Sequence, residues 1–190
     1  MNEDLHETIV DVKSGHPPYV EKIRNLLWAV IQNSLFRYSP FFCYGWRRFL
    51  LRCFGAELHK SVNICRRVRM IYPWGLHAKE NVTICNDCWL ICSGGIYLEK
   101  NAQICEYAKI ITGSHDSSSS GFVGVAKRIT LEENSWVGTA AILVSGGKKL
   151  TIGRGAIVGA GSVVMRNVKP MTIVVGNPAK FLMDREFTRE

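Results

Sequence analysis

The stretch that decides the fold is Ile152-Gly-Arg-Gly-Ala-Ile-Val-Gly-Ala-Gly-Ser-Val-Val164, in which an aliphatic residue returns every six positions. The aliphatic residues are Ile152, Val158 and Val164, and a small residue, Ala156 or Ser162, follows four positions after each of the first two. A hexapeptide period of this kind is typical of a parallel β-helix. The chain is therefore predicted to contain a solenoid.

The same phase continues on the N-terminal side of this stretch. Its positions, occupied by aliphatic residues and one alanine, are Leu58, Ile64, Met70, Ala78, Ile84, Leu90, Leu98, Ile104, Ile110, Leu131, Val137 and Leu143. The first three coils repeat every twenty residues and the last two every twenty-one. Tyr72-Pro73-Trp74-Gly75 falls at a corner, where proline and glycine suit a turn. We predict an all-β solenoid of about five coils over residues 55–170.

One long connection, residues 113–130, interrupts the repeat. It opens with Gly113-Ser114-His115-Asp116 and continues through Ser117 to Ser120 and Gly121, a flexible composition. Connections of this length inside a compact domain are usually functional or disordered. We predict a loop that protrudes from the solenoid, with His115 at its mouth.

The segments before the solenoid are predicted to be an arm and a helical hairpin. Residues 1–19 are polar and end in His16-Pro17-Pro18, which prevents a helix from continuing. Residues 20–54 show apolar residues at helical spacing, a break at Ser39-Pro40, and a second short helix. The second helix has one apolar and one basic face, namely Trp46, Phe49, Leu50 and Cys53 against Arg47, Arg48 and Arg52.

Two interpretations of residues 20–54 are open. The helices could cover the unpaired strand edge of the first coil, which would otherwise promote aggregation. They could instead make a weak contact with an anionic membrane surface, because the segment is basic and aromatic. We favour the cap. At the other end, residues 171–190 leave the repeat through Gly176-Asn177-Pro178 and are predicted to form a short helical tail.

Composition and charge limit where the protein is expected to act and which ligands it is expected to bind. The chain has 190 residues, a net charge of +8 and no run of eighteen apolar residues, so we expect one sizeable domain without a spanning helix. Acidic residues near the start argue against an export signal, and seven cysteines, an odd number, argue for reduced thiols in the cytoplasm. The positive charge favours an anionic ligand, although we expect no nucleic-acid partner.

The spacing Cys85-x-x-Cys88-x-x-x-Cys92 invites a metal-site interpretation, but the repeat explains the cysteines better. Cys65, Cys85 and Cys105 are twenty residues apart, each directly after a core aliphatic residue, and Cys88 occupies a small-residue position. These cysteines are predicted to stack from coil to coil as compact fillers, and we expect no metal.

A combination of shorter stretches is more specific than the repeat alone. They are Gly-Trp-Arg-Arg-Phe-Leu-Leu-Arg (45–52), Ile-Tyr-Pro-Trp (71–74), Gly-Ser-His-Asp (113–116), Trp-Val-Gly (136–138), Ile-Val-Gly-Ala-Gly-Ser-Val-Val (157–164) and Gly-Asn-Pro-Ala-Lys (176–180). With them, residues 46–185 resemble the hexapeptide-repeat O-acetyltransferases, most of all the colanic-acid and capsular-polysaccharide branch, with galactoside and maltose acetyltransferases as relatives. The resemblance implies a left-handed β-helix, a homotrimer, acetyl-CoA as co-substrate, and a sugar or polysaccharide-precursor hydroxyl as acceptor.

The resemblance also implies the site residues. The family's catalytic histidine falls on His115, and an imidazole can accept the proton of a hydroxyl while that hydroxyl attacks a thioester directly. Asp116 and Trp136 are candidates for acceptor contact or support. The cofactor groove carries over onto a larger set, namely Trp136, Thr139, Ala160, Arg166, Lys180 and Arg185.

Three departures from the family pattern affect these assignments. The galactoside branch leads us to expect an arginine near position 183, where Met183 stands and Arg185 lies two residues on. The insertion Gly147-Lys148-Lys149 falls close to where the cofactor should run. Glycine usually follows the core aliphatic residue in this family, whereas cysteine, His59, Lys79 and Glu99 do so here, which makes the N-terminal coils unusual.

Other classes of activity fit less well. A zinc carbonic anhydrase shares the solenoid but needs three converging histidines, and with a twenty-residue coil His59 stacks on Lys79 rather than on His77. A sugar nucleotidyltransferase would need a further nucleotide-binding domain. Two alternatives stay open: an acyltransferase that uses an acyl carrier protein, which would suit the charge of +8, and a non-catalytic trimeric scaffold.

Overall fold

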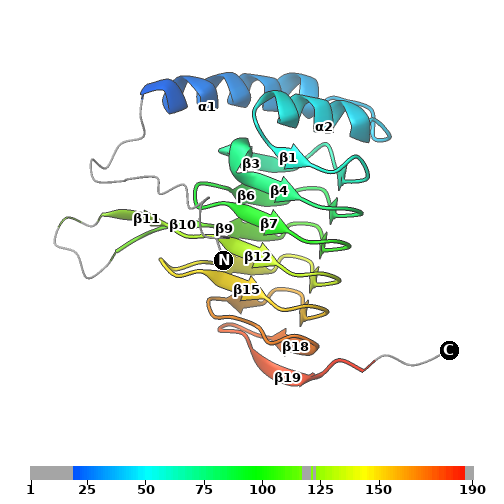
Figure 1. Cartoon of the computed structure of the whole chain (residues 1–190), viewed down its shortest axis with the longest axis vertical. Coiled ribbons are helices and arrows are strands. Elements are labelled where there is room, and N and C mark those ends of the chain that lie inside the picture. The colour runs from blue at the N-terminus through cyan, green and yellow to red at the C-terminus, as the bar shows by residue number, and fades with distance from the viewer. Residues whose placement is uncertain (1–18, 117–120, 122, 187–190) are drawn as a thin grey trace, which may run out of the picture.

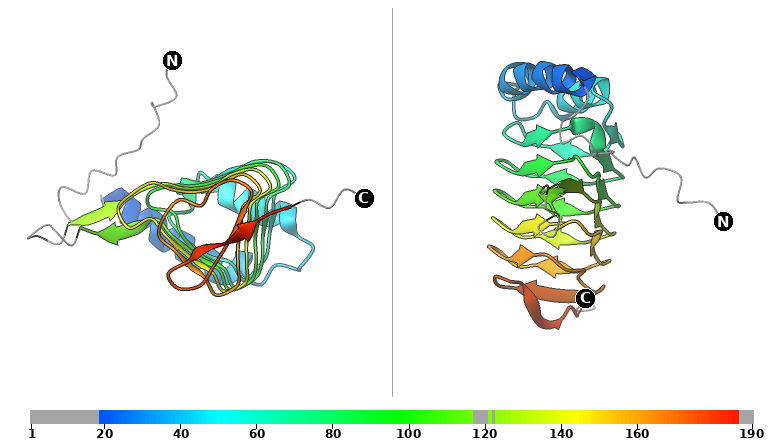
Figure 2. Two further views of the ribbon diagram at one scale, coloured as in Figure 1. Left: turned by 90° about the horizontal axis from the view of Figure 1, so that it is seen from below. Right: turned by 90° about the vertical axis from the view of Figure 1, so that its left-hand side faces the viewer.

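The computed structural model describes residues 19–116, 121 and 123–186. Short strands wind around a triangular prism and form three parallel sheets, which we name A, B and C in their order along each coil (Figures 1 and 2). Sheet A contains β1 (Glu57–Leu58), β4 (Leu76–Ala78), β7 (Ile96–Leu98), β12 (Ile129–Leu131) and β15 (Leu150–Ile152). The parallel strands of sheet B are β2 (Asn63–Ile64), β5 (Thr83–Ile84), β8 (Gln103–Ile104), β13 (Trp136–Val137), β16 (Ile157–Val158) and β18 (Thr172–Val175), and the antiparallel β19 (Lys180–Asp184) adds a seventh strand. Sheet C contains β3 (Arg69–Ile71), β6 (Trp89–Ile91), β9 (Lys109–Ile111), β14 (Ile142–Val144) and β17 (Val163–Val164).

The hexapeptide residues point inward on every coil. None of the fifteen predicted core positions from Leu58 to Val164 is more than 8% exposed. The parallel register stacks equivalent side chains on one another, as where Ile84 lies between Ile64 and Ile104. Stacking aliphatic side chains in this way removes apolar surface from water along the whole axis. The predicted all-β solenoid, a left-handed parallel β-helix, is confirmed.

The solenoid continues into a sixth, partial coil beyond the predicted five. β18 pairs in parallel with β16, and Val168 forms a parallel bridge with Ile152. The hexapeptide pattern did not predict this coil because the corner from sheet C to sheet A is shorter here. Val168 follows the core residue Val164 by four positions, whereas on the coil before, Ile152 follows Leu143 by nine. A shorter corner after β17 therefore shifts the repeat without ending it. The 3-10 turn η3 (Pro73–Gly75) occupies the predicted corner after β3.

The N-terminal helices lie across the open end of the first coil (Figure 1). They are α1 (Tyr19–Ile31) and α2 (Tyr44–Cys53), with the π-helical turn η2 (Gln32–Phe36) between them. Their side chains donate to carbonyl groups of the first coil: Arg48 to Val62 at 2.7 Å, Arg52 to Leu58 at 2.6 Å and Trp28 to Met70 at 3.0 Å. The cap is confirmed, because the edge that would otherwise be unpaired is covered and its carbonyls are satisfied. None of the helices in the described residues is long and apolar enough to cross a membrane.

The basic and apolar faces of α2 are not exposed and buried, respectively, as their polarity suggests. Arg47 is fully buried, and its guanidinium donates to the Ile64, Pro40 and Phe41 carbonyls. Burial lowers the pKa of this arginine. From the apolar face, Leu50 is buried but Trp46 and Phe49 are 41% and 54% exposed. The first coil presents carbonyl oxygens that need N–H donors, so an inward arginine suits this edge better than another aliphatic side chain.

The C-terminal tail is a β-hairpin, so the prediction of a short tail helix is wrong. β19 (Lys180–Asp184) runs antiparallel to β18, with Lys180 opposite Val175 and Asp184 opposite Thr172. Thr172-Ile-Val-Val175 is a run of β-branched residues, which favours a strand over a helix. β19 therefore covers the last edge of sheet B, as the helices cover the first edge. The predicted arm, residues 1–19, lies outside the described residues except for Tyr19.

Candidate active site

The interruption of the repeat is an antiparallel hairpin that projects from the corner between sheets C and A (Figure 2). β10 (Gly113–His115) pairs with β11 (Gly124–Ala126), and His115 lies opposite Gly124. The Asp116 amide N–H donates to the Val123 carbonyl at 2.8 Å. His115 is exposed and Asp116 is half-buried. Most of the serine-rich tip, residues 117–120, falls outside the described residues.

Buried hydroxyl groups fix the stem of this hairpin. Thr112, the residue before β10, is fully buried; its hydroxyl donates to the Ile91 carbonyl at 2.6 Å and accepts from the Gly94 N–H at 2.8 Å. Ser145, one coil further on, donates to the Thr112 carbonyl at 2.8 Å. These bonds satisfy polar groups that the departing chain would leave unpaired. The sequence prediction missed both residues, although a polar residue directly before the interruption was an available signal.

The Gly147-Lys148-Lys149 insertion lies beside the hairpin. A Cβ on Gly147 would lie 3.3 Å from Cγ2 of Val125 in β11, and the residue has a φ of +79°. The Lys148 amide N–H donates to the Ser145 carbonyl at 2.9 Å, which closes the turn. The positive φ favours glycine at this turn, and a larger residue would also have to displace the Val125 side chain slightly. Lys148 and Lys149 are exposed on the corner from which His115 projects.

Four predicted cofactor residues share another side of the prism. Trp136 begins β13 in sheet B and is 45% exposed. Thr139 and Ala160 occupy the corner between sheets B and C on successive coils, where the Gly161 N–H donates to the Thr139 carbonyl at 2.8 Å. Lys180 begins β19 opposite Val175, one coil further along. All four side chains are exposed, and we call this set (Trp136, Thr139, Ala160 and Lys180) the donor line.

The two predicted cofactor arginines lie elsewhere. Arg185 lies at the corner between sheets A and B, where its Nη1 donates to the Gly155 carbonyl at 2.8 Å and the Asn134 carbonyl at 3.3 Å. It lines a polar hollow of about 370 Å³ together with Asn81, Asn101, Gln103, Asn134 and Trp136. Arg166 is exposed and follows β17, on the corner between sheets C and A.

The predicted site residues of one chain therefore fall into two groups. His115, Asp116 and Arg166 belong to the corner between sheets C and A. The donor line belongs to sheet B and its corner with sheet C, and Arg185 lies at the other margin of sheet B. Sheet C and the aliphatic core separate the two groups. A single chain does not bring His115 to the donor line.

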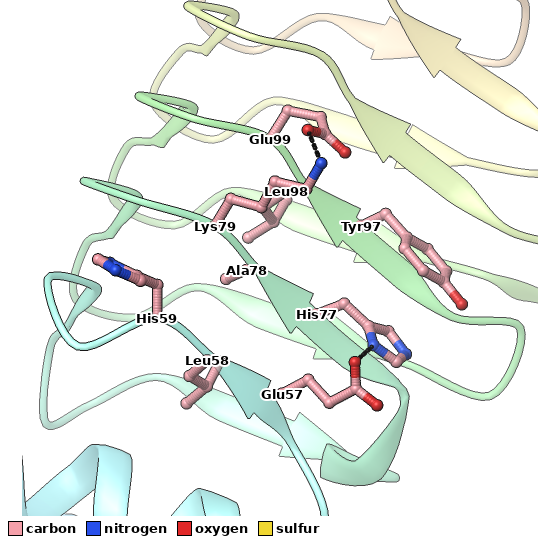
Figure 3. A pocket seen from close by; sticks show the side chains of 9 residues that line it. All are labelled: Glu57, Leu58, His59, His77, Ala78, Lys79, Tyr97, Leu98 and Glu99. Carbon is pink, nitrogen blue, oxygen red and sulfur yellow. Dashed lines mark hydrogen bonds and ion pairs between the residues drawn. The ribbon is translucent and has the colours of Figure 1, made fainter.

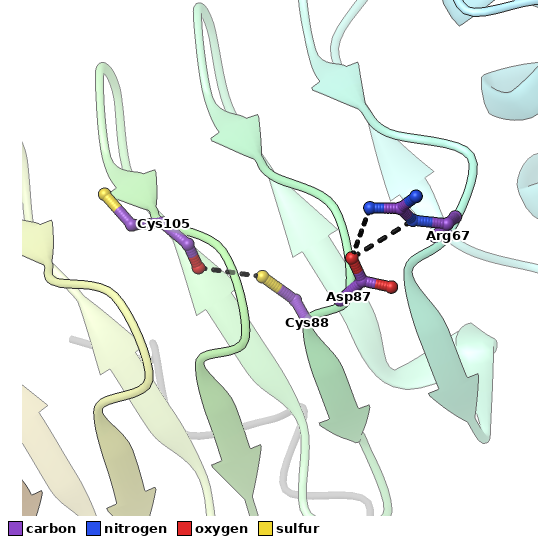
Figure 4. Close-up of polar contacts among 4 residues, drawn as sticks. All are labelled: Arg67, Asp87, Cys88 and Cys105. Carbon is purple, nitrogen blue, oxygen red and sulfur yellow. Dashed lines mark hydrogen bonds and ion pairs between the residues drawn. The ribbon is translucent and has the colours of Figure 1, made fainter. Parts of the chain in front are cut away.

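Thiols occupy the corner between sheets B and C on the coils before the donor line. Cys65, Cys85 and Cys105 directly follow the stacked residues Ile64, Ile84 and Ile104. Sγ of Cys105 accepts the Trp136 indole N–H at 2.7 Å, and Cys88 donates from Sγ to the Cys105 carbonyl at 3.0 Å (Figure 4). The bond from Trp136 to Cys105, which the sequence did not predict, ties the thiol column to the donor line.

Three of these thiols, Cys65, Cys85 and Cys88, are kept neutral by their surroundings. Burial, followed by the nearby Glu106 carboxylate, raises the pKa of Cys85 to about 12, and burial also raises the pKa of Cys65 and Cys88. A protonated thiol is a poor nucleophile and a poor metal ligand. Within the described residues, no group of three or more histidine, cysteine, aspartate or glutamate side chains could hold a metal ion. Charged side chains also bridge neighbouring coils, as where Arg67 pairs with Asp87 at 2.6 Å (Figure 4).

A second hollow, of about 400 Å³, lies on the outer face of sheet A (Figure 3). His77 pairs with Glu57 at 3.0 Å and stacks on the ring of Tyr97, with centroids 4.3 Å apart and planes 7° apart. The Arg128 guanidinium lies 4.8 Å from the centroid of Tyr97. The Tyr97 ring is therefore occupied by neighbouring groups, and this column stabilises the outer face of the sheet.

The three histidines of the repeat region do not converge. His59 lies at a corner opposite Lys79, as the twenty-residue spacing predicts, because Leu58 pairs with Ala78. His77 lies on sheet A and His115 on the hairpin. This arrangement does not provide the three-histidine ligand set of a zinc carbonic anhydrase.

The chain is similar to known acetyltransferases both in sequence and in structure. No family model matches the chain. WcaF of Escherichia coli (strain K12), assigned as a colanic acid biosynthesis acetyltransferase, is 35% identical over 163 residues, which are 86% of this chain and 88% of that protein. A maltose O-acetyltransferase from Clostridium difficile 630 superposes with a TM-score of 0.77 at 25% identity and covers 90% of each chain. The hexapeptide-repeat acetyltransferase VCA0836 from Vibrio cholerae O1 biovar eltor, complexed with acetyl coenzyme A, has the same fold, with a TM-score of 0.74 at 20% identity over 87% of this chain and 89% of that one.

Proposed function

This chain belongs to the hexapeptide-repeat acetyltransferases, and from that premise we propose that it moves an acetyl group from acetyl-CoA to a hydroxyl of a sugar or polysaccharide precursor. The donor is supported by the Vibrio cholerae protein, whose structure holds acetyl coenzyme A. The acceptor class is supported by the assignments of the relatives, which name colanic acid and maltose.

The observation that carries the proposal is the position of His115. This exposed histidine lies on the hairpin that interrupts the repeat, and Thr112 and Ser145 fix the hairpin's stem from below. Side chains with chemical roles often lie on loops that a rigid scaffold positions. His115 is therefore the residue to which we assign the proton transfer.

The proposed reaction needs one general base and no covalent intermediate on the protein. Acetyl-CoA supplies a thioester carbon that a hydroxyl oxygen can attack. His115 accepts the proton of that hydroxyl as the new C–O bond forms, and it returns the proton to the sulfur when the C–S bond breaks. The raised pKa of Cys85 keeps this thiol protonated near neutral pH, which agrees with direct transfer.

The donor line fits an extended ligand that lies along the axis of the solenoid. Thr139 and Ala160 are small residues on successive coils, and a Cβ on the neighbouring Gly161 would meet nothing within 4 Å. This open corner suits the pantetheine arm of the donor. Lys180 at the end of the line is placed to meet phosphate, for which an ammonium group is a strong partner. Trp136, at the other end, would flank the acetyl group.

Because His115 and the donor line lie on different sides of one chain, we propose that the site is completed between two chains. A homotrimer with parallel solenoid axes would place the hairpin of one chain beside the donor line of the next, three times over. The outer faces of the prism carry aromatic side chains suited to such packing: Trp89, Tyr107 and Trp136 are 38%, 56% and 45% exposed.

The remaining predicted residues take supporting roles in this arrangement. Asp116 and Trp136 are proposed to contact the acceptor or to support the site. Arg166, on the same corner as His115, would reach the phosphates of a donor held by the neighbouring chain. Arg185, bound to the Gly155 carbonyl, would support Trp136 and the end of the donor line. We expect the protein to act in the cytoplasm, where its seven free cysteines would stay reduced.

Release of the CoA thiol from acetyl-CoA, measured over a panel of sugar acceptors, tests the proposed function. His115→Ala should lower turnover by about 10²–10⁴-fold, the usual contribution of a general base, with little change in acetyl-CoA affinity. His77→Ala is the matched control, because that ring pairs with Glu57 on sheet A, away from both groups. Near-full activity of His115→Ala would overturn the mechanism. Binding of acetyl-CoA without turnover on any acceptor would favour a scaffold.

A further inference from the structure

The outward side of the helical cap gathers more exposed apolar side chains than the rest of the described chain. Twelve exposed large hydrophobic residues lie between Tyr19 and Phe49, against ten elsewhere in the described residues. They are Tyr19, Val20, Ile23, Leu26, Leu27, Val30, Leu35, Tyr38, Phe41, Phe42, Trp46 and Phe49, and we call them the cap surface. Single exposed apolar residues are ordinary, but a concentration of this kind marks an interaction surface.

The capping role does not account for the cap surface. The inner side of the cap already closes the first coil through the buried Trp28, Phe36, Leu50 and Leu51 and through the arginine bonds to edge carbonyls. α1 buries only Trp28, although it has 13 residues and is mostly apolar. Its Tyr19, Ile23, Leu26 and Val30 follow one another at spacings of three or four residues, which places them along one exposed face.

Four aromatic residues of the cap surface pack against one another in pairs while still exposed. Phe41 and Phe42 meet edge to face, with ring centroids 5.3 Å apart. Trp46 lies against Phe49, with centroids 5.7 Å apart, and donates its indole N–H to the Leu35 carbonyl at 3.2 Å. These paired rings include a tryptophan, and the cap surface adds the exposed Tyr19 and Tyr38; tryptophan and tyrosine suit the boundary between lipid headgroups and acyl chains.

Charge favours a lipid surface over a second copy of the chain. Residues 19–54 carry six basic side chains and one acidic side chain, Glu21. Four of the basic side chains are arginines that donate to backbone carbonyls of the cap and the first coil, which leaves Lys22 and Arg37 outside these bonds. Two copies joined cap to cap would bring these like charges together. A trimer with parallel solenoid axes would use the sides of the prism, whereas the cap lies at its end (Figure 1). An anionic bilayer attracts Lys22, Arg37 and the net positive charge of the segment, and it accepts the exposed apolar side chains.

We propose that the cap surface docks on the surface of an anionic lipid bilayer. α1, with 13 residues, is shorter than the about twenty that a spanning helix needs, so it lies flat in the headgroup region. The solenoid then extends away from the membrane, and the hairpin with His115 stands to its side, below the cap (Figure 1). This surface is separate from both groups of the proposed acetyl-transfer site.

Sedimentation of the full chain with vesicles tests the proposal. Vesicles of phosphatidylglycerol mixed with phosphatidylcholine should bind the protein at least about tenfold better than phosphatidylcholine alone, and added salt should weaken the binding. The double variant Leu27→Asp, Phe42→Asp should lose about tenfold or more, because both side chains are more than half exposed and would enter the lipid. Phe181→Ser, Leu182→Ser is the matched control, since it removes two equally exposed apolar side chains from the opposite end of the prism.

A second readout does not depend on a charged variant. Brominated phosphatidylcholine in the anionic vesicles should quench tryptophan fluorescence of the wild-type chain, and Trp46→Phe should lose most of this quenching, because Trp46 lies on the cap surface. Equal vesicle binding by the wild type and the Leu27→Asp, Phe42→Asp variant would overturn the proposal. So would the absence of vesicle binding together with a smaller oligomer in that variant, which would show the cap surface to be a contact between copies.

Discussion

The corner between sheets B and C is built in two ways along one solenoid. On the first three coils, the residue after the core aliphatic residue is a cysteine: Cys65, Cys85 or Cys105. On the next two coils it is Gly138 or Gly159. A Cβ on Gly138 would lie 2.8 Å from both the Ala160 nitrogen and the Val158 carbonyl oxygen, and one on Gly159 would lie 2.6 Å from Val175 Cγ1.

This difference separates a structural half of the corner from the half proposed to bind the donor. The cysteine half has room for a side chain and fills it with thiols, and burial raises the pKa of two of them, Cys65 and Cys85. The glycine half leaves bare backbone beside the exposed Thr139 and Ala160. Within the donor line, Thr139 and Ala160 each follow a glycine position that has no room for a side chain. Variants that exchange the residues of the two halves test whether this difference matters.

The largest effect is expected from Gly138→Cys, which gives the glycine half the residue of the cysteine half. The free energy of unfolding should fall by about 2–4 kcal/mol, because the two closest atoms belong to the backbone and cannot move aside cheaply. Chemical denaturation measures the loss. The reverse exchange, Cys85→Gly, is the control and should cost less, about 1 kcal/mol. A Gly138→Cys variant as stable as the wild type would show that the two halves do not differ in space.

A smaller effect is expected from the cations proposed to meet the donor's phosphates. Lys180→Ala and Arg166→Ala should each weaken CoA more than dephospho-CoA, by about 1.5–3 kcal/mol if the side chain makes a charged hydrogen bond to phosphate. Calorimetric titration of both ligands measures the difference. Lys60→Ala, an exposed lysine on the first coil, should leave both affinities unchanged. Equal losses for the two ligands would move the phosphate site away from these residues.

The smallest effect concerns pH and the cysteine half alone. Since the pKa of Cys85 is raised to about 12 in the folded chain, its protonated form contributes stability that is complete below the unfolded-state pKa of about 8.5 and is lost as pH rises toward 12. Between pH 8 and pH 10 this thiol should cost about 1 kcal/mol of stability, after allowing for its partial exposure. Thermal unfolding of Cys85→Ala should depend less on pH across that range. An unchanged pH dependence would mean that Cys85 is not buried as described.

The sequence predicts the repeating part of the fold well, because a six-residue period leaves little choice. The fifteen hexapeptide positions between Leu58 and Val164 are buried as expected, and each corner position follows by counting. Counting fails at Val168, where a short corner shifts the phase, and the β-branched run Thr172–Val175 was consequently not recognised as a strand. The tail was predicted to be a helix, but β18 pairs with the edge strand β16 of the preceding coil, and β19 then pairs with β18.

The cap shows a different limit of sequence reasoning. The need to cover the first edge could be predicted, but the burial of Arg47 could not, since hydrophobic patterns assign charged side chains to water. The Ile64, Pro40 and Phe41 carbonyls that this arginine binds become neighbours only when α2 lies across the coil. Tertiary contacts therefore decide which face of α2 is turned inward.

The residues of the candidate site follow from the family resemblance, whereas their arrangement needed the structure. Thr139 and Ala160 are twenty-one residues apart, so counting alone places them at one corner. The direction of the hairpin that carries His115 depends on the Thr112 and Ser145 hydrogen bonds, which no repeat encodes. The separation of His115 from the donor line within one chain could therefore not be predicted.

The measurement that tests the central claim most directly mixes two chains with different defects. His115→Ala chains and Lys180→Ala chains, dissociated together and reassembled, are assayed for thiol release at an acetyl-CoA concentration too low to compensate for the weakened donor binding. If each site joins His115 of one chain to the donor line of the next, about a quarter of the sites in an equal mixture regain both residues, and activity should rise above that of either unmixed variant. No recovery in trimers shown to contain both chains would contradict the account, because each site would then be built within a single chain.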